Sequence, residues 1–298
     1  MQSDQNNLIL TEAADFDLKH IFECGQCFRW DLQNDGSYLG IAFGKALKIN
    51  CPSPGTLVLY ETSPEDFHSI WKHYFDFERD YGRIKAVLSQ DPIMKQAVGC
   101  GHGIRILRQE LWETVVSFII SSSNNIPRIK KIIDALCKSF GNKIEYMGNI
   151  YYSFPPPEAL AGCTLDELSV IRAGYRDKYI LDAAKRFASG SLSPEHFQGL
   201  ETPQAKKLLM EMNGVGSKVS DCILLFGLNR FDSFPVDVWI KRIMERLYFG
   251  SPQSNDKIER FALQKFGNLS GIAQQYLFFY AREQKNESFT LCPPTAKS

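Results

Sequence analysis

The stretch NGVGSKVSDCILLFGL, residues 213–228, decides the fold of this chain. Two glycines flank a valine, and an apolar run with helical spacing follows at once. Because glycine adopts backbone conformations that other residues resist, Gly214 and Gly216 predict a tight turn that leads into a helix. The preceding segment TPQAKKLLMEMNG opens with a Thr-Pro pair, which is a helix start signal. Residues 203–228 are therefore predicted to form a helix–hairpin–helix.

A hairpin of this kind can bind both an anion and a cation. The N–H groups that open its second helix can bind a phosphate, so Gly214, Val215 and Gly216 are predicted to contact DNA. Carbonyl oxygens suit hard cations, and those of Met210, Met212 and Val215 can hold a structural cation. The alternative is an ordinary αα-hairpin without either ligand.

Two side chains beside the hairpin can carry out a reaction on DNA. Lys218 lies in the first turn of the second helix, where the helix dipole opposes a protonated amine. A neutral amine can attack a sugar carbon and form a Schiff base. Asp237, in FPVDVW, precedes another helix; it is expected to cap that helix and can also stabilise a cation or move a proton. The alternatives are a solvated lysine and a purely structural cap.

Composition indicates a soluble globular protein. Of the 298 residues, 44% are hydrophobic and 23% are charged. No apolar stretch is long enough to span a bilayer, and the start MQSDQNNLIL does not resemble a secretory signal. The net charge is zero, but the first hundred residues carry 9 Lys and Arg against 14 Asp and Glu, so the rest of the chain is mildly basic. We expect the basic part to meet a polyanion.

Eight cysteines are scattered along the chain, which predicts free thiols in a reducing compartment. Cys24 and Cys27 form a lone CxxC. No second pair accompanies it, which argues against a zinc site.

Residues 1–107 are predicted to form an N-terminal α+β unit. Short β-type runs such as SYLGIAF and TLVLYE are separated by the turn signals NDG at 34–36 and GK at 44–45. Helix start signals follow, SP at 63–64 and DP at 91–92. The pattern indicates a small antiparallel sheet with helices packed against it.

The chain from residue 108 to 286 is predicted to be helical. Its first helix, LWETVVSFIIS, is apolar enough to be buried, and a polar break separates it from a helix opened by Pro127. Residues 142–163 are expected to be a loop-rich connector. Residues 287–298 form a C-terminal tail that we expect to be disordered.

The pattern GVGSKVSDC…PVDVW resembles the helix–hairpin–helix, Gly/Pro-rich, aspartate (HhH-GPD) superfamily of base-excision DNA glycosylases. Within it, the chain is most similar to the 8-oxoguanine DNA glycosylase/AP lyase family. The resemblance extends through CGQCFRW, GIRILRQELWETVVSFIISSSNNIPRI, AGYRDKY and AQQYLFF. It implies an α+β fold in which a TBP-like N-terminal antiparallel β-sheet with flanking helices packs on an all-α helix–hairpin–helix glycosylase core.

The resemblance also implies the active site. Lys218 would be the nucleophile at C1′ of the damaged nucleotide, and Asp237 would stabilise positive charge at the sugar. For the base pocket, the implied residues are Gly25, whose carbonyl meets N7–H of 8-oxoguanine, Gln274 at the pyrimidine edge, and Phe278 and Cys222 on the two faces of the base. On the residues alone, Gly25 would be a turn glycine, and Phe278 and Cys222 would be core residues.

A second implied group separates the DNA strands. Its members match family positions that fill the hole left by the flipped base and contact the orphaned cytosine: Asn124, Asn125, Arg128, Tyr175 and Arg176. Without the resemblance, each arginine would be read as a surface ion-pair residue.

Two positions depart from the family pattern. Ser123 stands where the best-known members have asparagine, and Trp239, expected near the DNA, stands where they have histidine. The first change implies weaker discrimination of the opposite base. Trp239 can donate an N–H group or stack, but it cannot become cationic.

The implied function is excision of 8-oxoguanine, preferably opposite cytosine, followed by β-elimination of the abasic strand. The alternatives are a glycosylase/lyase for other oxidised or ring-opened purines and a non-catalytic DNA-binding module. Damaged double-stranded DNA is the expected partner of a monomeric protein that does not bind membranes. The expected location is the bacterial cytoplasm or nucleoid, or the eukaryotic nucleus.

No cofactor is expected. The iron–sulfur branch of the superfamily has a four-cysteine cluster after its last helices, whereas Cys292 alone lies in that region here. An iron–sulfur cluster is therefore not expected.

Overall fold

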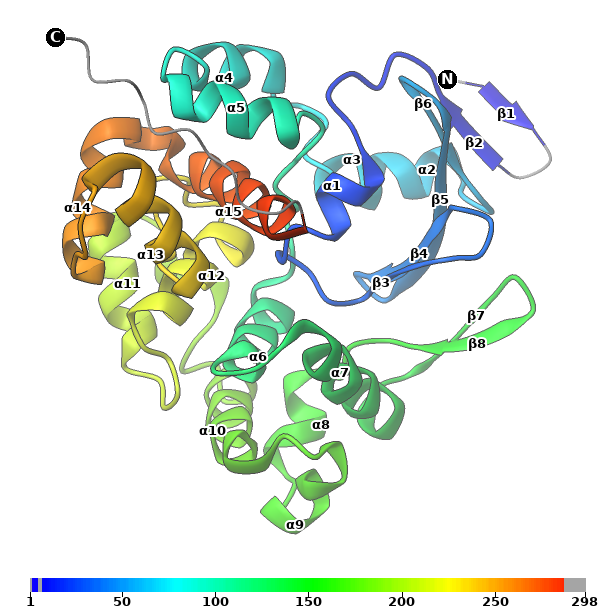
Figure 1. The fold of residues 1–298 in the computed structure, drawn as a ribbon. Coiled ribbons are helices and arrows are strands. Elements are labelled where there is room, and N and C mark those ends of the chain that lie inside the picture. Colours follow the sequence, from blue (N-terminus) through cyan, green and yellow to red (C-terminus); the bar gives the residue numbers. More distant parts are fainter. Residues whose placement is uncertain (1, 5–6, 287–298) are drawn as a thin grey trace, which may run out of the picture.

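The computed structural model describes residues 2–4 and 7–286. A six-stranded antiparallel sheet lies on one side of the molecule, and helices form the rest (Figure 1). This architecture confirms the predicted α+β fold. Cys292 and the predicted tail lie outside the described residues.

The sheet has the order β1-β2-β6-β5-β4-β3. Side chains alternate between its faces, so Leu47, Ile49, Leu57 and Leu59 all enter one buried core. Gly40 lies directly under Trp30, where a Cβ atom would come within 2.2 Å of the indole. The strands are β1 (Gln2–Asp4), β2 (Asn7–Leu10), β3 (Trp30–Leu32), β4 (Tyr38–Ala42), β5 (Lys45–Ser53) and β6 (Thr56–Leu59).

Short helices cover one face of this sheet (Figure 1). The stacked rings of Phe22 and Trp30, with centroids 4.1 Å apart, join helix α1 to the sheet. Trp71 and Phe75 complete this core from the helical segment that follows β6. The helices are α1 (Leu18–Phe22), α2 (Pro64–Asp66), the π-helical turn η1 (Phe67–Trp71) and α3 (Lys72–Tyr74).

The remaining helices surround α6 and α12, which pack against each other. The rings of Phe118 and Phe226 stack with centroids 5.3 Å apart, and Gly227 lets the two helices approach closely near Thr114. The helices are α4 (Tyr81–Leu88), α5 (Pro92–Cys100), α6 (Leu111–Ser121), α7 (Ile126–Phe140), α8 (Pro157–Ala161), α9 (Leu165–Leu168), α10 (Asp177–Ala188), α11 (Thr202–Met210), α12 (Ser217–Gly227), α13 (Val238–Met244), α14 (Asn255–Phe266) and α15 (Ser270–Asn286).

Single turns of 3-10 or π helix complete this part of the chain. They are η2 (Ser169–Ile171), η3 (Gly174–Arg176), η4 (Pro194–Phe197), η5 (Glu245–Phe249) and η6 (Gly267–Leu269).

A two-stranded hairpin, β7 (Lys143–Tyr146) and β8 (Asn149–Tyr152), replaces part of the loop expected at 142–163. It reaches back to the sheet (Figure 1), where Tyr146 Oη donates to the carbonyl of Tyr60 over 2.8 Å.

Helices α4 and α5, although they lie within the first 107 residues, contribute Ile84 and Met94 to the larger helical core. The division at residue 107 therefore stays a prediction. Within the described part of the chain, no helix has the length and apolarity needed to cross a membrane.

Candidate active site

The predicted hairpin lies between α11 and α12. Gly214 has a φ of +86°, and a Cβ atom there would lie 2.6 Å from the ring of Tyr179, so only glycine fits. The carbonyl of Met212 accepts from the N–H of Val215 over 3.2 Å and closes the turn. Gly216 is the N-cap of α12 and has no side chain to occupy the first N–H groups of that helix. These groups can therefore bind a phosphate.

Lys218 projects from the first turn of α12 toward α6. Its Nζ donates to the Ser121 hydroxyl over 3.4 Å and lies 5.4 Å from the centroid of the Phe118 ring. Cys222, one turn further along α12, is buried, and loss of solvent raises the pKa of its thiol to about 11 even though the charge of Lys218 opposes this shift. The thiol is therefore neutral at physiological pH and presents an apolar surface.

Asp237 is the N-cap of α13, as predicted. Its Oδ1 accepts from the N–H of Ile240 over 2.8 Å. Burial raises the pKa of this carboxyl, while the N–H of Ile240 and the charge of Lys218 pull the pKa down. The carboxylate is thus held in a fixed position near a cation and partly withdrawn from water.

One cavity of ≈ 950 Å³ brings most of the predicted residues together. The end of α1, the α6–α7 turn, the hairpin, the segment before α13 and α15 all contribute to its walls. The predicted residues that line it are Gly25, Asn124, Asn125, Gly214, Gly216, Lys218, Cys222, Asp237, Trp239, Gln274 and Phe278. The cavity lies where a nucleotide could meet both Lys218 and Asp237.

Gly25 and Phe278 form one end of the cavity. Gly25 has a φ of +78°, and a Cβ atom there would lie 3.0 Å from Phe278 Cε1. Gln274 is buried, and its amide donates to the carbonyl of Pro235 and accepts from Gln275. We call the part of the cavity bounded by Gly25, Cys222, Gln274 and Phe278 the base pocket.

Gln26, which the sequence did not single out, anchors the segment that carries Gly25. Its fully buried amide donates to the carbonyls of Ile21 and Arg105 and accepts from the N–H of Leu107 over 2.8 Å. All three bonds are to the backbone, so the side chain fixes the course of the chain beside the base pocket. The residues around Gln26 in the sequence give no sign that its side chain is buried or that it anchors this segment.

The residues predicted to separate the DNA strands lie on the turn between α6 and α7, at the start of α7 and on η3. Asn125 caps α7 by accepting from the N–H of Arg128, whose own side chain is exposed. Asn124 donates back to the carbonyl of Ile120. Tyr175, on η3, is 55% exposed, as expected for a residue that enters a DNA stack.

Arg176 is folded back onto the protein instead of reaching outward. Its side chain is buried, and it donates to the carbonyls of Ser122, Ser123 and Ala173. Arg176 therefore supports the α6–α7 turn directly, and its guanidinium stacks over the ring of Tyr175 with 4.4 Å between Cζ and the centroid.

The two departures from the family pattern occupy different surroundings. Ser123 has a φ of +48°, a conformation that asparagine tolerates better than serine. Trp239 lies in the first turn of α13 and lines the cavity, with the guanidinium of Arg242 5.9 Å from the indole centroid.

Backbone carbonyls at the end of α11 and in the turn after it are candidate ligands for a metal ion. Helix α11 ends at Met210, so its last carbonyls have no donor within the helix, and the carbonyls of Met212 and Val215 follow in the turn. This set of oxygens fits a hard cation. The thiols of Cys24 and Cys27 each donate to a backbone carbonyl, and within the described residues they belong to no group of three or more metal-ligand side chains.

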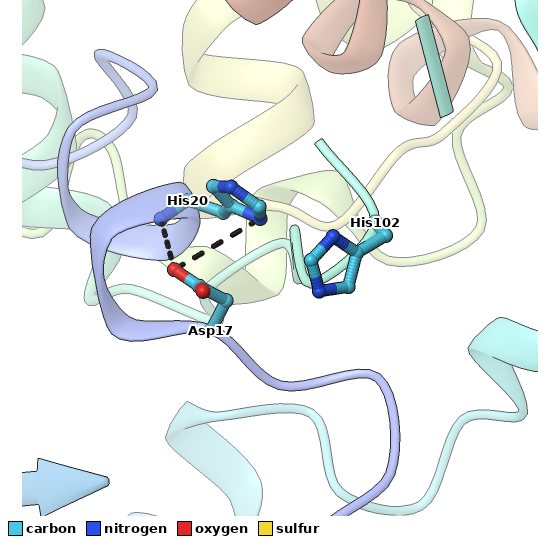
Figure 2. A group of neighbouring side chains, drawn as sticks. All are labelled: Asp17, His20 and His102. Carbon is cyan, nitrogen blue, oxygen red and sulfur yellow. Dashed lines mark hydrogen bonds and ion pairs between the residues drawn. The ribbon is translucent and has the colours of Figure 1, made fainter. Parts of the chain in front are cut away.

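Asp17, His20 and His102 also carry metal-ligand atoms, which lie within 4.8 Å of one another (Figure 2). Ligands of a tetrahedral zinc ion would be roughly 3.4 Å apart. Here Asp17 Oδ1 accepts from the N–H of His20, and His20 Nδ1 accepts from the N–H of Gly103. These two bonds tie the start of α1 to the backbone at Gly103.

Family models match almost the whole chain. Residues 8–115 match "8-oxoguanine DNA glycosylase, N-terminal domain", and residues 116–268 match "HhH-GPD superfamily base excision DNA repair protein". The N-glycosylase/DNA lyase of Saccharomyces cerevisiae is 36% identical over 212 residues, which cover 59% of this chain and 56% of the yeast protein.

Solved structures agree in fold. One described as MBOgg1 in complex with a low-affinity DNA ligand is 48% identical with a TM-score of 0.93, covering 95% of this chain and 98% of that chain. The 8-oxoguanine glycosylase/lyase of Clostridium acetobutylicum, in complex with DNA containing cytosine opposite 8-oxoguanine, is 44% identical with a TM-score of 0.92 and the same coverage. This chain therefore belongs to the HhH-GPD superfamily of base-excision DNA repair proteins, in the branch that carries the N-terminal domain of 8-oxoguanine DNA glycosylases.

Proposed function

We propose that this protein is a bifunctional DNA N-glycosylase and AP lyase. It excises 8-oxoguanine from double-stranded DNA, preferably opposite cytosine, and then cleaves the abasic strand. The observation that carries the proposal is that Lys218, Asp237 and the base pocket share one cavity. The names of the yeast and Clostridium relatives, N-glycosylase/DNA lyase and 8-oxoguanine glycosylase/lyase, support it.

Lys218 is the nucleophile in this proposal. After its ammonium group gives up a proton to solvent, the amine attacks C1′ of the flipped nucleotide, so that an N–C1′ bond forms and the bond to the base breaks with its electron pair leaving on the base. Loss of the amine proton and opening of the sugar yield a Schiff base. The cationic imine acidifies a C2′ proton, whose removal expels the 3′ phosphate by β-elimination. Water then hydrolyses the imine and restores the amine.

Asp237 stabilises the charge that develops at the sugar. Its capping bond to Ile240 holds the carboxylate in one position before substrate arrives, which is what makes electrostatic stabilisation effective. The upward shift of its pKa by burial also brings the group closer to the range in which it can exchange protons. The Ser121 hydroxyl, 3.4 Å from Lys218 Nζ, orients the amine.

The base pocket selects the lesion. The carbonyl of Gly25 accepts from N7–H, which 8-oxoguanine has and guanine lacks, while Gln274 bonds the pyrimidine edge. Phe278 and the neutral thiol of Cys222 cover the two faces of the base. One hydrogen bond discriminates by about 1–3 kcal/mol when its loss leaves a buried partner unpaired.

Asn124, Asn125, Arg128, Tyr175 and Arg176 open the duplex and read the orphaned cytosine. The exposed ring of Tyr175 wedges into the stack. For Arg176 to reach a base, its bonds to the α6–α7 turn must first break, whereas Arg128 is already exposed. The side chain of Ser123 is shorter than that of asparagine and contacts the orphaned cytosine less well, so selectivity for cytosine is relaxed.

The hairpin residues Gly214, Val215 and Gly216 bind a DNA phosphate, and Trp239 contacts the flipped nucleotide. The carbonyls of Met210, Met212 and Val215 can hold a structural cation. The reaction needs no cofactor and no iron–sulfur cluster. The protein acts as a monomer in the compartment that holds the genome.

Labelled duplexes that place 8-oxoguanine opposite each of the four bases test the proposal. We expect release of 8-oxoguanine and a β-elimination product, fastest opposite cytosine. A duplex containing a ring-opened purine tests the alternative substrate: excision of that lesion alone would contradict the proposal. No product from any damaged duplex would indicate a non-catalytic DNA-binding protein.

The variant Arg128→Ala tests how the opposite base is read. Because Arg128 is exposed, its removal should leave the fold intact and reduce the preference for cytosine by about tenfold. An unchanged preference would contradict the role assigned to Arg128.

A further inference from the structure

Arg282 lies one helical turn after Phe278 on α15 and lines the cavity. Its Nη1 donates to the carbonyl of Glu23 over 2.8 Å, and its Cζ lies 5.7 Å from the centroid of the Phe278 ring. The guanidinium therefore joins two segments that are far apart in sequence. No step of the proposed reaction uses this side chain.

The carbonyl that Arg282 binds belongs to the C-cap of α1, two residues before Gly25. Gly25 and Phe278 are in contact across the base pocket, as the 3.0 Å approach of a Cβ atom at Gly25 to the Phe278 ring indicates. Arg282 contacts the chain leading to one wall and the ring that forms the other. It is thus placed to set the distance between the two walls.

Other contacts also join α1 to α15. The rings of His20 and Phe279 meet edge to face with centroids 4.9 Å apart. Asp17 Oδ1 accepts from the N–H of His20, and His20 Nδ1 accepts from the N–H of Gly103 (Figure 2 shows Asp17 and His20). His20 and Phe279 do not line the cavity. Loss of Arg282 should therefore leave α1 docked and change chiefly the segment at Gly25.

Arg282 has a second, electrostatic effect. Its positive charge is one of the influences that lower the pKa of Asp237, against the dominant upward shift from burial. Any influence on the sugar chemistry through Asp237 would be the same whether or not a base is present. A test must therefore separate base recognition from catalysis at the sugar.

We propose that Arg282 is a positioning residue for base recognition: by tying the carbonyl of Glu23 to the Phe278 ring, it sets the gap between Gly25 and Phe278 that receives the damaged base. The inference rests on the proposed function.

The test compares two substrates in single-turnover experiments. Arg282→Met keeps the length of the side chain and removes its charge and donors. We expect excision of 8-oxoguanine opposite cytosine to fall about tenfold, the effect of losing a charged hydrogen bond. Strand cleavage at a preformed abasic site, which has no base to position, should stay at the wild-type rate. Arg282→Lys should restore part of the excision rate, because an ammonium group can donate to the same carbonyl.

Lys19→Met is the matched control. Lys19 pairs with Glu283 over 3.7 Å and also joins α1 to α15, but it is exposed and does not line the cavity. Both of its rates should equal those of the wild type. An equal loss of excision in Lys19→Met would show a general docking effect and overturn the assignment.

Two further outcomes would overturn the inference. Unchanged excision by Arg282→Met would show that the hydrogen bond from Arg282 to the carbonyl of Glu23 does not affect excision. An equal loss on both substrates, with the acid limb of abasic-site cleavage displaced, would show that Arg282 acts through Asp237. If the wild type cleaves abasic DNA but releases no 8-oxoguanine, the proposed function fails. That result comes from the wild type alone and does not depend on the Arg282→Met variant.

Discussion

In the proposed function, base recognition depends on a glycine that combines two constraints. Gly25 has a φ of +78°, which disfavours any side chain, and its Cβ position faces the Phe278 ring at 3.0 Å. The ring cannot retreat freely, since Phe278 is part of α15 and carries Arg282 beside it. The shape of the base pocket at this wall therefore depends on Gly25 having no side chain.

We expect Gly25→Ala to slow excision of 8-oxoguanine by at least about tenfold, because the added methyl group narrows the base pocket and strains the backbone. Cleavage of a preformed abasic site should be retained. Gly148→Ala is the control: Gly148 has a φ of +72° but open space around its Cβ position. If both variants lose excision equally, backbone strain and not pocket shape is responsible.

We expect Asp237 to give the proposed reaction a pH dependence. Burial raises the pKa of its carboxyl above the ordinary 3.8, so the carboxylate is lost on acidification at a higher pH than in an exposed aspartate. The excision rate should therefore fall as the pH drops through this raised pKa. Asp237→Asn keeps the cap on Ile240 but should lower the rate about 100-fold and remove that acid limb. A variant that keeps the same limb in its pH–rate profile would show that another group titrates.

The helix–hairpin–helix is joined to α14 by a partly buried charged cluster. Lys206 on α11 pairs with Asp221 on α12 over 2.9 Å and with Glu259 on α14 over 2.6 Å. Burial raises the pKa of Asp221 to about 7, although Lys206 pulls the pKa down. The cluster joins three helices through one cation.

Lys206→Met should destabilise the fold by about 3 kcal/mol, because it leaves two carboxylates near each other without their cation. The loss of stability should be larger at pH 8, where the carboxyl of Asp221 is more ionised than at pH 5. It should shrink at pH 5, where a carboxyl with a raised pKa is protonated in the folded state. Thermal unfolding at the two pH values measures this. A loss that does not depend on pH would contradict the account of Asp221.

The helical elements of the site could be predicted because their signals are local. The Thr-Pro start and the Gly-Val-Gly turn placed a hairpin at 203–228, and the structure has α11 and α12 there. Hairpin β7–β8 was missed because its stability depends on a distant contact, that of Tyr146 with Tyr60. Its local signals are the Gly148 turn and the short β-type runs KIEY and NIYY on either side of it.

Side-chain environments were harder to predict than elements. Lys218 and Asp237 occupy a first turn and an N-cap, positions that sequence patterns define. The burial of Arg176 and the anchoring role of Gln26 arise from contacts between segments far apart in the chain. Nothing in the neighbouring residues could indicate them.

The cavity exists only because several parts of the chain meet. The N-terminal segment supplies Gly25, the hairpin supplies Lys218 and the last helix supplies Phe278. Ion pairs join the sheet region to the helical core, Arg29 with Glu113 over 3.6 Å and Lys130 with Asp31 over 2.7 Å. In the proposed reaction, the chemistry comes from the hairpin and the nearby N-cap of α13, whereas recognition of the base also needs the N-terminal segment and the last helix.

Borohydride trapping tests the central claim most directly. The protein is incubated with a duplex containing 8-oxoguanine opposite cytosine, and borohydride reduces any Schiff base to a stable amine. We expect a covalent protein–DNA adduct whose attachment maps to Lys218 by peptide mass spectrometry and which is absent in a folded Lys218→Gln variant. An adduct at another residue, or no adduct from a wild-type protein that binds the duplex, would contradict the account.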